Sequence, residues 1–221
     1  MEFKSNLQIQ AYKLIRQQII YADLYPGKKV SEKILEESLR IGRTPIREAL
    51  ILLRQQGLVN TIPQSGNYIS LIDLNSAKNA RFVRENLERQ IMIECCTKIE
   101  DQKRKILETL LFEQKKAIYN KDSRDFFHND NLFHKVCYEI AGREEIWQWL
   151  EMQNTHLERF RWLRLKTEEL KWEKIIEQHY QLFDALINKN PEEVDFLTST
   201  HLHLMLDEQN TILATHPKYF N

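Results

Sequence analysis

From about Asn75 to the end of the chain, hydrophobic residues recur at the three- and four-residue spacing that is typical of amphipathic α-helices. Glycine and proline, which interrupt helices, occur in this part only at Gly142, Pro191 and Pro217. The pattern predicts an all-α second domain of about six helices, with breaks near residues 100, 120, 142, 166 and 190. The spacing is carried by Phe82, Leu87 and Ile91; by Ile106, Leu110 and Leu111; by Phe133, Val136 and Ile140; and by Ile175, Ile176, Leu182 and Leu186.

The first third of the chain has shorter hydrophobic segments and more turn residues. Apolar residues at helical spacing predict an amphipathic helix over Leu7–Ala22, and the turn residues Tyr25–Gly27 stop it. Ser31 stands where it can cap a second, short helix that reaches Leu39. The chain then breaks before a third segment.

The third segment predicts a helix followed by a β-ribbon. Thr44 is the expected N-cap, and Pro45 takes the first helical position, where its missing N–H costs nothing. Two short β-prone runs, LVNTI and NYISL, flank a turn centred on Ser65 and Gly66. The helix is expected to bury one face, formed by Ile46, Ala49, Leu50 and Leu53.

These elements follow the order of a winged helix-turn-helix. Arginines gather at the start of the third helix, where the helix N-terminus attracts phosphate and guanidinium groups can reach base edges. Residues 1–72 contain ten Lys or Arg against six Asp or Glu, whereas the whole chain balances at 32 of each. From spacing and charge alone, the alternative is a small helical domain whose arginines only cover a solvated surface.

Several short motifs of the first third occur in an order that is specific to one family. They are Pro26 with Gly27, the segment GRTPIREAL at residues 42–50, Gly57–Val59 and Gly66. Together they resemble the GntR family of bacterial transcription regulators, over roughly residues 7 to 72. The resemblance implies a winged helix-turn-helix that binds double-stranded DNA.

The resemblance also implies roles for individual side chains. Arg43 and Arg47 are similar to the family's major-groove and phosphate contacts on the recognition helix. Thr44 would donate from its hydroxyl or amide to a phosphate, and Lys33 would face the DNA backbone from the preceding helix. Gly66 would let the wing approach the minor groove.

Three positions depart from the family pattern. Arg40 stands where the family usually has the turn glycine, Gly42 where it usually has serine, and Glu36 where a small alanine is usual. We expect Arg40 to adopt a left-handed backbone conformation, which strains a residue that carries a Cβ atom.

The second domain contains a group of possible metal ligands. Asp130 and His134 are four residues apart in a helical stretch, so both side chains project from one face. His179 and His201 lie in two later predicted helices. Three imidazoles and a carboxylate suit zinc, nickel or manganese. The alternative is ordinary: each histidine would be solvated or hydrogen-bonded, and the Asp-x3-His spacing would be a simple hydrogen-bonded pair.

A second resemblance covers residues 75 to 215, which are similar to the FCD ligand-binding domain of the FadR subfamily. It is carried by Arg84 with Glu88, Asp130-x3-His134 before Ala141-Gly142, Glu177-x-His179, and Pro191 with a histidine ten residues later. The resemblance implies that Asp130, His134, His179 and His201 bind the metal. His203 is left only as an alternative to His201, because a residue two positions away would point elsewhere on a helix. Arg143 replaces a usual asparagine, and His128, His156 and His216 match nothing.

Such a site leaves coordination positions open for a small carboxylate, which a nearby guanidinium would hold. Arg84 is the first candidate for this guanidinium, and Arg161 is the second. Binding of the organic acid would shift the helices and, in a homodimer, change the spacing of the two recognition helices. A two-fold dimer predicts an inverted-repeat operator.

Cysteine usage and hydropathy indicate the compartment. The three cysteines are odd in number and lack CxxC spacing, which favours the reducing cytoplasm. No segment reaches the roughly 18 apolar residues of a membrane span, and the first residues show no apolar signal-peptide core. We therefore expect a cytoplasmic protein without a membrane partner.

The combined expectation is a mainly α chain. Residues 1–73 would form a winged helix-turn-helix, and residues 74–221 would form a helical bundle that binds metal and effector and dimerises. The function would be that of a DNA-binding regulator, and the family resemblance implies repression, which is the commoner behaviour in that family. One alternative is a metal-dependent enzyme, although no HExxH and no evident general base accompany the ligands. Another is a helical interaction module with incidental metal affinity.

Overall fold

The computed structural model describes residues 6–221, so residues 1–5 of the predicted first domain lie outside the described residues. The described chain is mainly α-helical and divides into two compact units. Unit 1 contains the chain up to Ala77 together with residues 155–160 and 216–221. Unit 2 contains residues 78–154 and 161–215. It stays a prediction that residues 1–73 form a DNA-binding domain and that residues 74–221 form a domain for effector binding and dimerisation.

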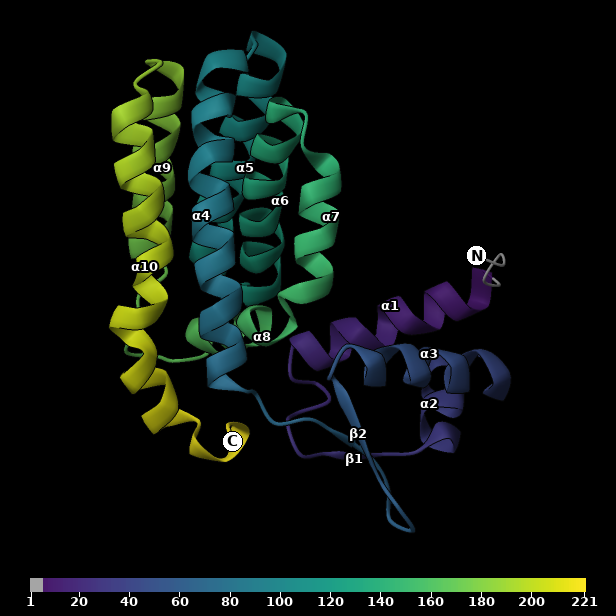
Figure 1. The fold of residues 1–221 in the computed structure, drawn as a ribbon. Helices are drawn as coiled ribbons and strands as arrows, with labels where there is room; N and C mark the ends of the chain where they lie inside the picture. Colours follow the sequence, from purple (N-terminus) through teal and green to yellow (C-terminus); the bar gives the residue numbers. More distant parts are fainter. Residues whose placement is uncertain (1–5) are drawn as a thin grey trace. The chain divides into compact units, whose positions relative to one another are not determined.

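Unit 1 is built on three helices, α1 (Asn6–Ile20), α2 (Glu32–Leu39) and α3 (Arg43–Gln55). Figure 1 shows α1 running alongside α3, and the two helices share a hydrophobic core. This core confirms the buried face that the sequence predicts for the third helix. Its fully buried members include Ala11, Ile15, Ile46, Ala49, Leu50, Leu53 and Leu58.

The start of α3 differs from the expectation. Gly42, not Thr44, is the N-cap, so Arg43, Thr44 and Pro45 fill the first three helical positions. Proline is tolerated there because the first four N–H groups of a helix have no intrahelical acceptor. The predicted left-handed conformation of Arg40 is confirmed, since this residue caps the end of α2 with φ of 54°.

The wing is a three-stranded antiparallel sheet in the order β1-β3-β2. The predicted ribbon corresponds to β2 (Val59–Ile62) and β3 (Gly66–Ile69), with Ile62 opposite Gly66. The predicted two-stranded ribbon is confirmed, but β1 (Lys29–Val30), which also pairs with β3, was not predicted. A two-residue strand is too short to show the alternation by which strands are predicted.

Unit 2 is a bundle of long helices (Figure 1). The predicted breaks are all found, but an additional break at Asn154 makes seven helices among the described residues instead of about six. Asn154 ends one helix and begins the next without glycine or proline, so the sequence gives no signal. The helices are α4 (Leu74–Lys98), α5 (Asp101–Asn120), α6 (Ser123–Ala141), α7 (Glu144–Gln153), α8 (Thr155–Leu165), α9 (Glu173–Ile187) and α10 (Pro191–Thr215). The first residues of α4 and residues 155–160 of α8 belong to unit 1.

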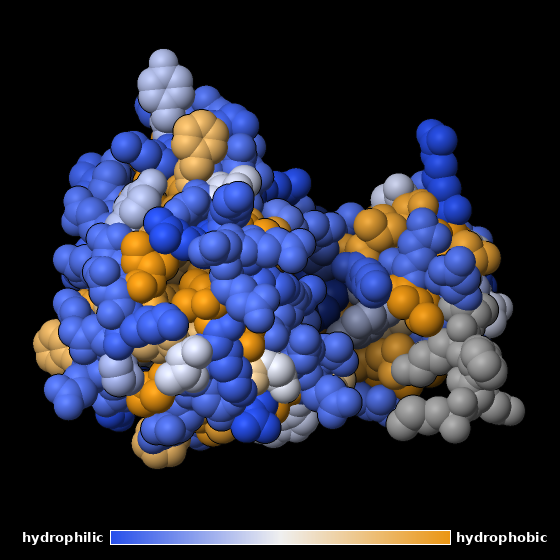
Figure 2. Space-filling view, turned by 90° about the horizontal axis from the view of Figure 1, so that it is seen from above, coloured by the Kyte–Doolittle hydropathy of each residue, from blue (hydrophilic) through white to orange (hydrophobic). Residues whose placement is uncertain are grey.

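The face of the molecule seen in Figure 2 is largely hydrophilic. Figure 2 shows hydrophilic residues over most of the visible face, with hydrophobic residues in separate groups between them. Within the described chain, no helix combines the length and the hydropathy that crossing a membrane requires. The three cysteines are reduced and buried.

Candidate metal centre and DNA-binding helix

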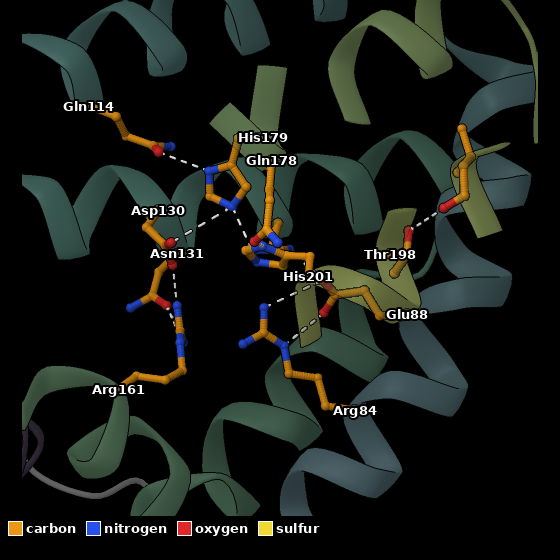
Figure 3. A network of polar contacts seen from close by, with 12 residues as sticks. Arg84, Glu88, Gln114, Asp130, Asn131, Arg161, Gln178, His179, Thr198 and His201 are labelled. Atoms are coloured by element: carbon orange, nitrogen blue, oxygen red, sulfur yellow. Dashed lines mark hydrogen bonds and ion pairs between the residues drawn. The ribbon is translucent and has the colours of Figure 1, made fainter. Parts of the chain in front are cut away.

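Three histidines from three helices of unit 2 meet in its interior. His134 lies on α6, His179 on α9 and His201 on α10, and each offers a ring nitrogen within 4.8 Å of the others. His134 and His179 are completely inaccessible to solvent. Figure 3 shows side chains of α6, α9 and α10 directed toward one centre. Segments far apart in the sequence thus form one cluster.

In two of the rings, a glutamine oxygen outside the cluster contacts the Nδ1 atom. His179 Nδ1 lies 2.8 Å from Gln114 Oε1, and His201 Nδ1 lies 3.0 Å from Gln178 Oε1. Gln114 is itself oriented, because its amide nitrogen donates to the Asn129 carbonyl oxygen. Since an amide oxygen only accepts, each Nδ1 must carry the proton. The Nε2 atoms of both rings therefore face the centre as lone pairs.

Glu88 orients the third ring, that of His134, in the same way. Its buried carboxylate contacts His134 Nδ1, which leaves His134 Nε2 toward the centre. This Nε2 atom is buried and has no hydrogen-bond partner among the described residues. An imidazole that turns one ring nitrogen to a carboxylate and the other to the centre is the usual outer arrangement of a metal-bound histidine.

The resulting arrangement fits a cation. The Nε2 atoms of His179 and His201 lie 3.3 Å apart, and both are acceptors when their Nδ1 atoms carry the protons. The Nε2 atom of His134 is a third acceptor without a donor. Buried acceptors that face one another without a donor are costly. A divalent ion would satisfy all three.

Asp130 is the fourth predicted ligand and borders the cluster. Its Oδ1 atom lies 3.8 Å from His179 Nε2. Its other oxygen accepts from Arg161, whose second amino group donates to Asn131 Oδ1 at 2.8 Å. One carboxylate oxygen therefore faces the imidazoles while the other is held by a guanidinium.

Arg84 is also paired with a carboxylate. Its Nε atom donates to Glu88 Oε2 at 2.8 Å, and both side chains are buried. The two arginines predicted to bind an effector, Arg84 and Arg161, thus approach the cluster from different sides, each through an acidic partner (Figure 3). The structure brings both predicted effector residues to the cluster.

The protonation states suit metal binding. Burial lowers the pKa of His179 to about 3, although Asp130 opposes this effect, and burial next to His179 lowers the pKa of His201. Burial alone would raise the pKa of Asp130, but Arg161 and His179 hold it below the ordinary value. Burial would likewise raise the pKa of Glu88, whereas Arg84 and His134 lower it. His179 and His201 are therefore neutral, and the carboxylates of Asp130 and Glu88 are ionised, near neutral pH.

The remaining histidines lie elsewhere. His203 is exposed and 3.8 Å from Asp207, so His201 and not His203 is in the cluster. His156 accepts the backbone N–H of Asp73 through Nδ1, and the ring of His216 stacks on Tyr219. His128 is exposed on α6. These positions agree with their lack of any match to the metal pattern.

The predicted DNA-contacting residues lie on unit 1. Arg43, Thr44 and Arg47 are exposed on the first two turns of α3. Lys33 is exposed on α2, 4.0 Å from Glu37. Gly66 begins β3 with φ of 127°, a conformation that side chains with a Cβ rarely adopt.

Sequence reasoning missed an acidic residue on this surface. Glu32, the first residue of α2, accepts hydrogen bonds from both Arg43 and Arg47. These hydrogen bonds, the one from Arg47 most of all, lower the pKa of Glu32. Gln114 and Gln178 were missed as well. None of the three shows a sequence signal, because their partners come from other helices.

Comparison with known families identifies both parts of the chain. Residues 7–69 match the family described as bacterial regulatory proteins, gntR family, and residues 80–204 match the FCD domain. The matched segments contain the α3 arginines and all three clustered histidines.

The similarity to known regulators extends over most of the chain. The HTH-type transcriptional repressor RspR of Escherichia coli K12 is 27% identical over 212 residues, which cover 96% of this chain and 92% of the relative. A regulator from an unstable DNA locus of Streptomyces ambofaciens is 30% identical over 209 residues, covering 95% and 87%.

Solved structures share the fold. Escherichia coli McbR/YncC has a TM-score of 0.80 at 20% identity and covers 98% of this chain and 100% of its own. A GntR regulator from Rhodococcus sp. RHA1 has a TM-score of 0.73 at 18% identity, covering 94% and 97%. The matched relatives are transcription regulators and not enzymes, so the metal-dependent enzyme weighed as an alternative is not supported.

Proposed function

Because the chain belongs to the GntR family of bacterial regulatory proteins and carries an FCD domain, we propose that it is a cytoplasmic repressor controlled by a small carboxylate. In this proposal, residues 1–73 bind an inverted-repeat operator. Residues 74–221 form the homodimer and hold the effector at or near a divalent metal, in the manner of the FadR subfamily. The convergence of three buried imidazoles in the helical unit is the observation that carries the effector part.

The DNA contact would be made by α3 and the wing. Arg43 and Arg47 present exposed guanidinium groups at the N-terminal end of α3, where backbone N–H groups also favour phosphate. Thr44 and Lys33 would add phosphate contacts, and Gly66 would let the wing approach the minor groove. A dimer would present two such helices to two half-sites.

The metal would be held by Asp130, His134, His179 and His201. Three imidazoles with one carboxylate suit zinc, nickel or manganese, and the donor set does not choose among them. A bound ion supplies a Lewis-acidic centre with open positions for carboxylate oxygens. Gln114 and Gln178 keep the Nε2 atoms of their histidines directed toward this centre.

The effector would be an anion because of the charges around the cluster. Arg84 and Glu88 balance each other, and Arg161 balances Asp130, so these two ion pairs add no net charge before metal is added. A divalent ion adds two positive charges in a buried site. A carboxylate would offset part of this charge, and Arg84 and Arg161 would supply additional donors to it.

The test begins with full-length protein purified without chelator, whose metal content is measured by elemental analysis. A duplex is then enriched by this protein from a random-sequence pool, and its affinity is measured by fluorescence anisotropy against a panel of small carboxylates. We expect at least one carboxylate to change the affinity of the metal-loaded protein. The H179A variant should lose this response, whereas H203A should keep it.

Each part of the proposal has its own contrary result. Full duplex affinity in the R43A and R47A variants, or an affinity that does not fall with salt, would rule out the DNA contact. Metal-loaded protein whose duplex affinity no carboxylate changes would rule out the effector mechanism. A monomer at the concentrations that bind DNA would rule out the homodimer.

A further inference from the structure

One carboxylate joins the two arginines of the recognition helix. Arg43 Nε donates to Glu32 Oε2 at 2.9 Å. Arg47 donates through Nε to Oε1 at 3.2 Å and through Nη2 to Oε2 at 3.3 Å. The arginine side chains are 67% and 59% exposed, whereas Glu32 is only 22% exposed. The acidic group thus lies beneath two exposed guanidinium groups.

The two arginines are held in different ways. Arg43 is bound only through Nε, so both terminal amino groups remain without an acceptor among the described residues. Two adjacent amino groups are the donors that match O6 and N7 of guanine. Arg47 is bound through Nε and Nη2, which leaves Nη1 as its one donor nitrogen without an acceptor among the described residues. A single charged donor suits a phosphate oxygen.

The charge of Glu32 also favours sequence-specific over non-specific DNA binding. Near a duplex, its carboxylate offsets one of the two positive charges that the arginines carry. Attraction to phosphate is independent of sequence and dominates non-specific binding. A negative charge at this position therefore weakens binding to any duplex, while the ordered Arg43 retains its base-reading donors.

We propose that Glu32 is a positioning residue that sets DNA sequence specificity, by holding Arg43 for a guanine and Arg47 for a phosphate while lowering affinity for unrelated DNA. This inference rests on the proposed DNA binding and adds a division of labour between the two arginines. The side chain reaches them because Ser31 caps α2 and places Glu32 in its first turn, beside the start of α3.

The experiment compares the full-length protein with the E32Q variant, which keeps the side-chain shape and loses the charge. The matched control is E36Q, which removes the same charge from the same helix, at a residue that pairs with neither arginine in the described part of the chain. Each protein selects from a random-sequence duplex pool. Affinities are then measured for the duplex that the unaltered protein enriches and for a scrambled duplex of equal composition.

We expect E32Q to bind the scrambled duplex more tightly and the enriched duplex no more tightly than before. The ratio of the two affinities should fall by about tenfold, which is within the range for loss of one bidentate base contact. A guanine preference in each half-site should weaken in the E32Q selection. The E36Q variant should keep both the ratio and the preference.

A readout without DNA separates positioning from a general effect of charge. In the free protein, the Nε–H signals of Arg43 and Arg47 in nitrogen-15 NMR should be protected from exchange, and E32Q should lose this protection. Unchanged signals, an unchanged affinity ratio, or equal effects of E32Q and E36Q would overturn the inference. Failure of the unaltered protein to enrich any duplex would instead contradict the proposed function.

Discussion

His179 and His201 face each other through their Nε2 atoms at 3.3 Å, while the Nδ1 atom of each ring is directed to a glutamine oxygen. Two lone pairs at this distance need a shared cation or an added proton. Burial opposes the added proton, since it lowers the pKa of both rings. This relationship leads to the first prediction, which concerns metal affinity.

Replacing His179 or His201 with alanine should lower the affinity for Zn²⁺ or Ni²⁺ by more than the roughly 10- to 100-fold that loss of an outer-shell partner costs. Isothermal calorimetry on chelator-treated protein measures this change. His203 lies two residues from His201 but is exposed, so H203A is the matched control. Equal losses in H201A and H203A would contradict the assignment of His201.

Glu88 provides a second prediction, because it pairs with Arg84 and also contacts His134 in the interior. The E88Q variant should lose about 3–5 kcal/mol of unfolding free energy, since it leaves a buried guanidinium without its counter-charge. Its metal affinity should fall by about 10- to 100-fold, as expected for an outer-shell partner. Urea unfolding and calorimetry measure the two effects.

The control for E88Q comes from a similar ion pair on the same helix. Arg89 of α4 pairs with Asp195 at 2.6 Å, but both side chains are partly exposed. The D195N variant should therefore cost less than about 1 kcal/mol and leave the metal affinity unchanged. If E88Q and D195N lower the free energy of unfolding by similarly small amounts, burial does not strengthen the contribution of the Arg84–Glu88 pair to stability.

The sequence predicts what local spacing and turn residues encode. The buried face of α3 and the capping of α2 by Ser31 depend on residues that are near neighbours along the chain, and the structure confirms them. The break at Asn154 and strand β1 were missed because short irregular segments carry no periodic pattern.

The candidate site was predictable only in its inner part. Asp130 and His134 share a helical face, which a spacing of four residues already indicates. Placing His179 and His201 beside them depended on family resemblance. The partners outside the cluster, such as Gln114 and Gln178, come from other helices, so no local pattern marks them. Convergence of distant helices is a property of packing, which a single sequence does not display.

Arg40 gives a prediction about stability. It ends α2 with φ of 54°, in the left-handed region where glycine is favoured. The R40G variant should be more stable by about 0.5–1 kcal/mol, because relief of the Cβ clash exceeds the entropy that glycine gains in the unfolded chain. Urea unfolding measures the change.

Two further glycine variants test whether the stabilisation by glycine depends on a left-handed backbone conformation at the substituted residue. Lys121 ends α5 with φ of 55°, so K121G should also stabilise the protein. Lys115 lies exposed inside the same helix, where K115G should cost about 1 kcal/mol. A loss of stability in both R40G and K121G would mean that the arginine and lysine side chains contribute more than the backbone strain costs.

The pH dependence of stability follows from His156. This ring accepts the backbone N–H of Asp73 through Nδ1, and a protonated ring cannot accept it. Burial, together with the nearby Arg159, lowers the pKa of His156 below the 6.5 of an unfolded chain. The contribution is therefore complete above about pH 6.5, and it is lost as the pH falls from there through the lower folded-state pKa.

The H156Q variant should accordingly show a shallower fall in melting temperature between pH 7 and pH 5 than the unaltered protein. His179 and His201 also have lowered pKa values, so some pH dependence should remain in this variant. His128 is exposed, and H128Q should follow the unaltered protein at every pH. Because His156 is only partly buried, the difference should be modest. Parallel melting curves for H156Q and the unaltered protein across this range would show that the Asp73 contact does not depend on the charge of the imidazole.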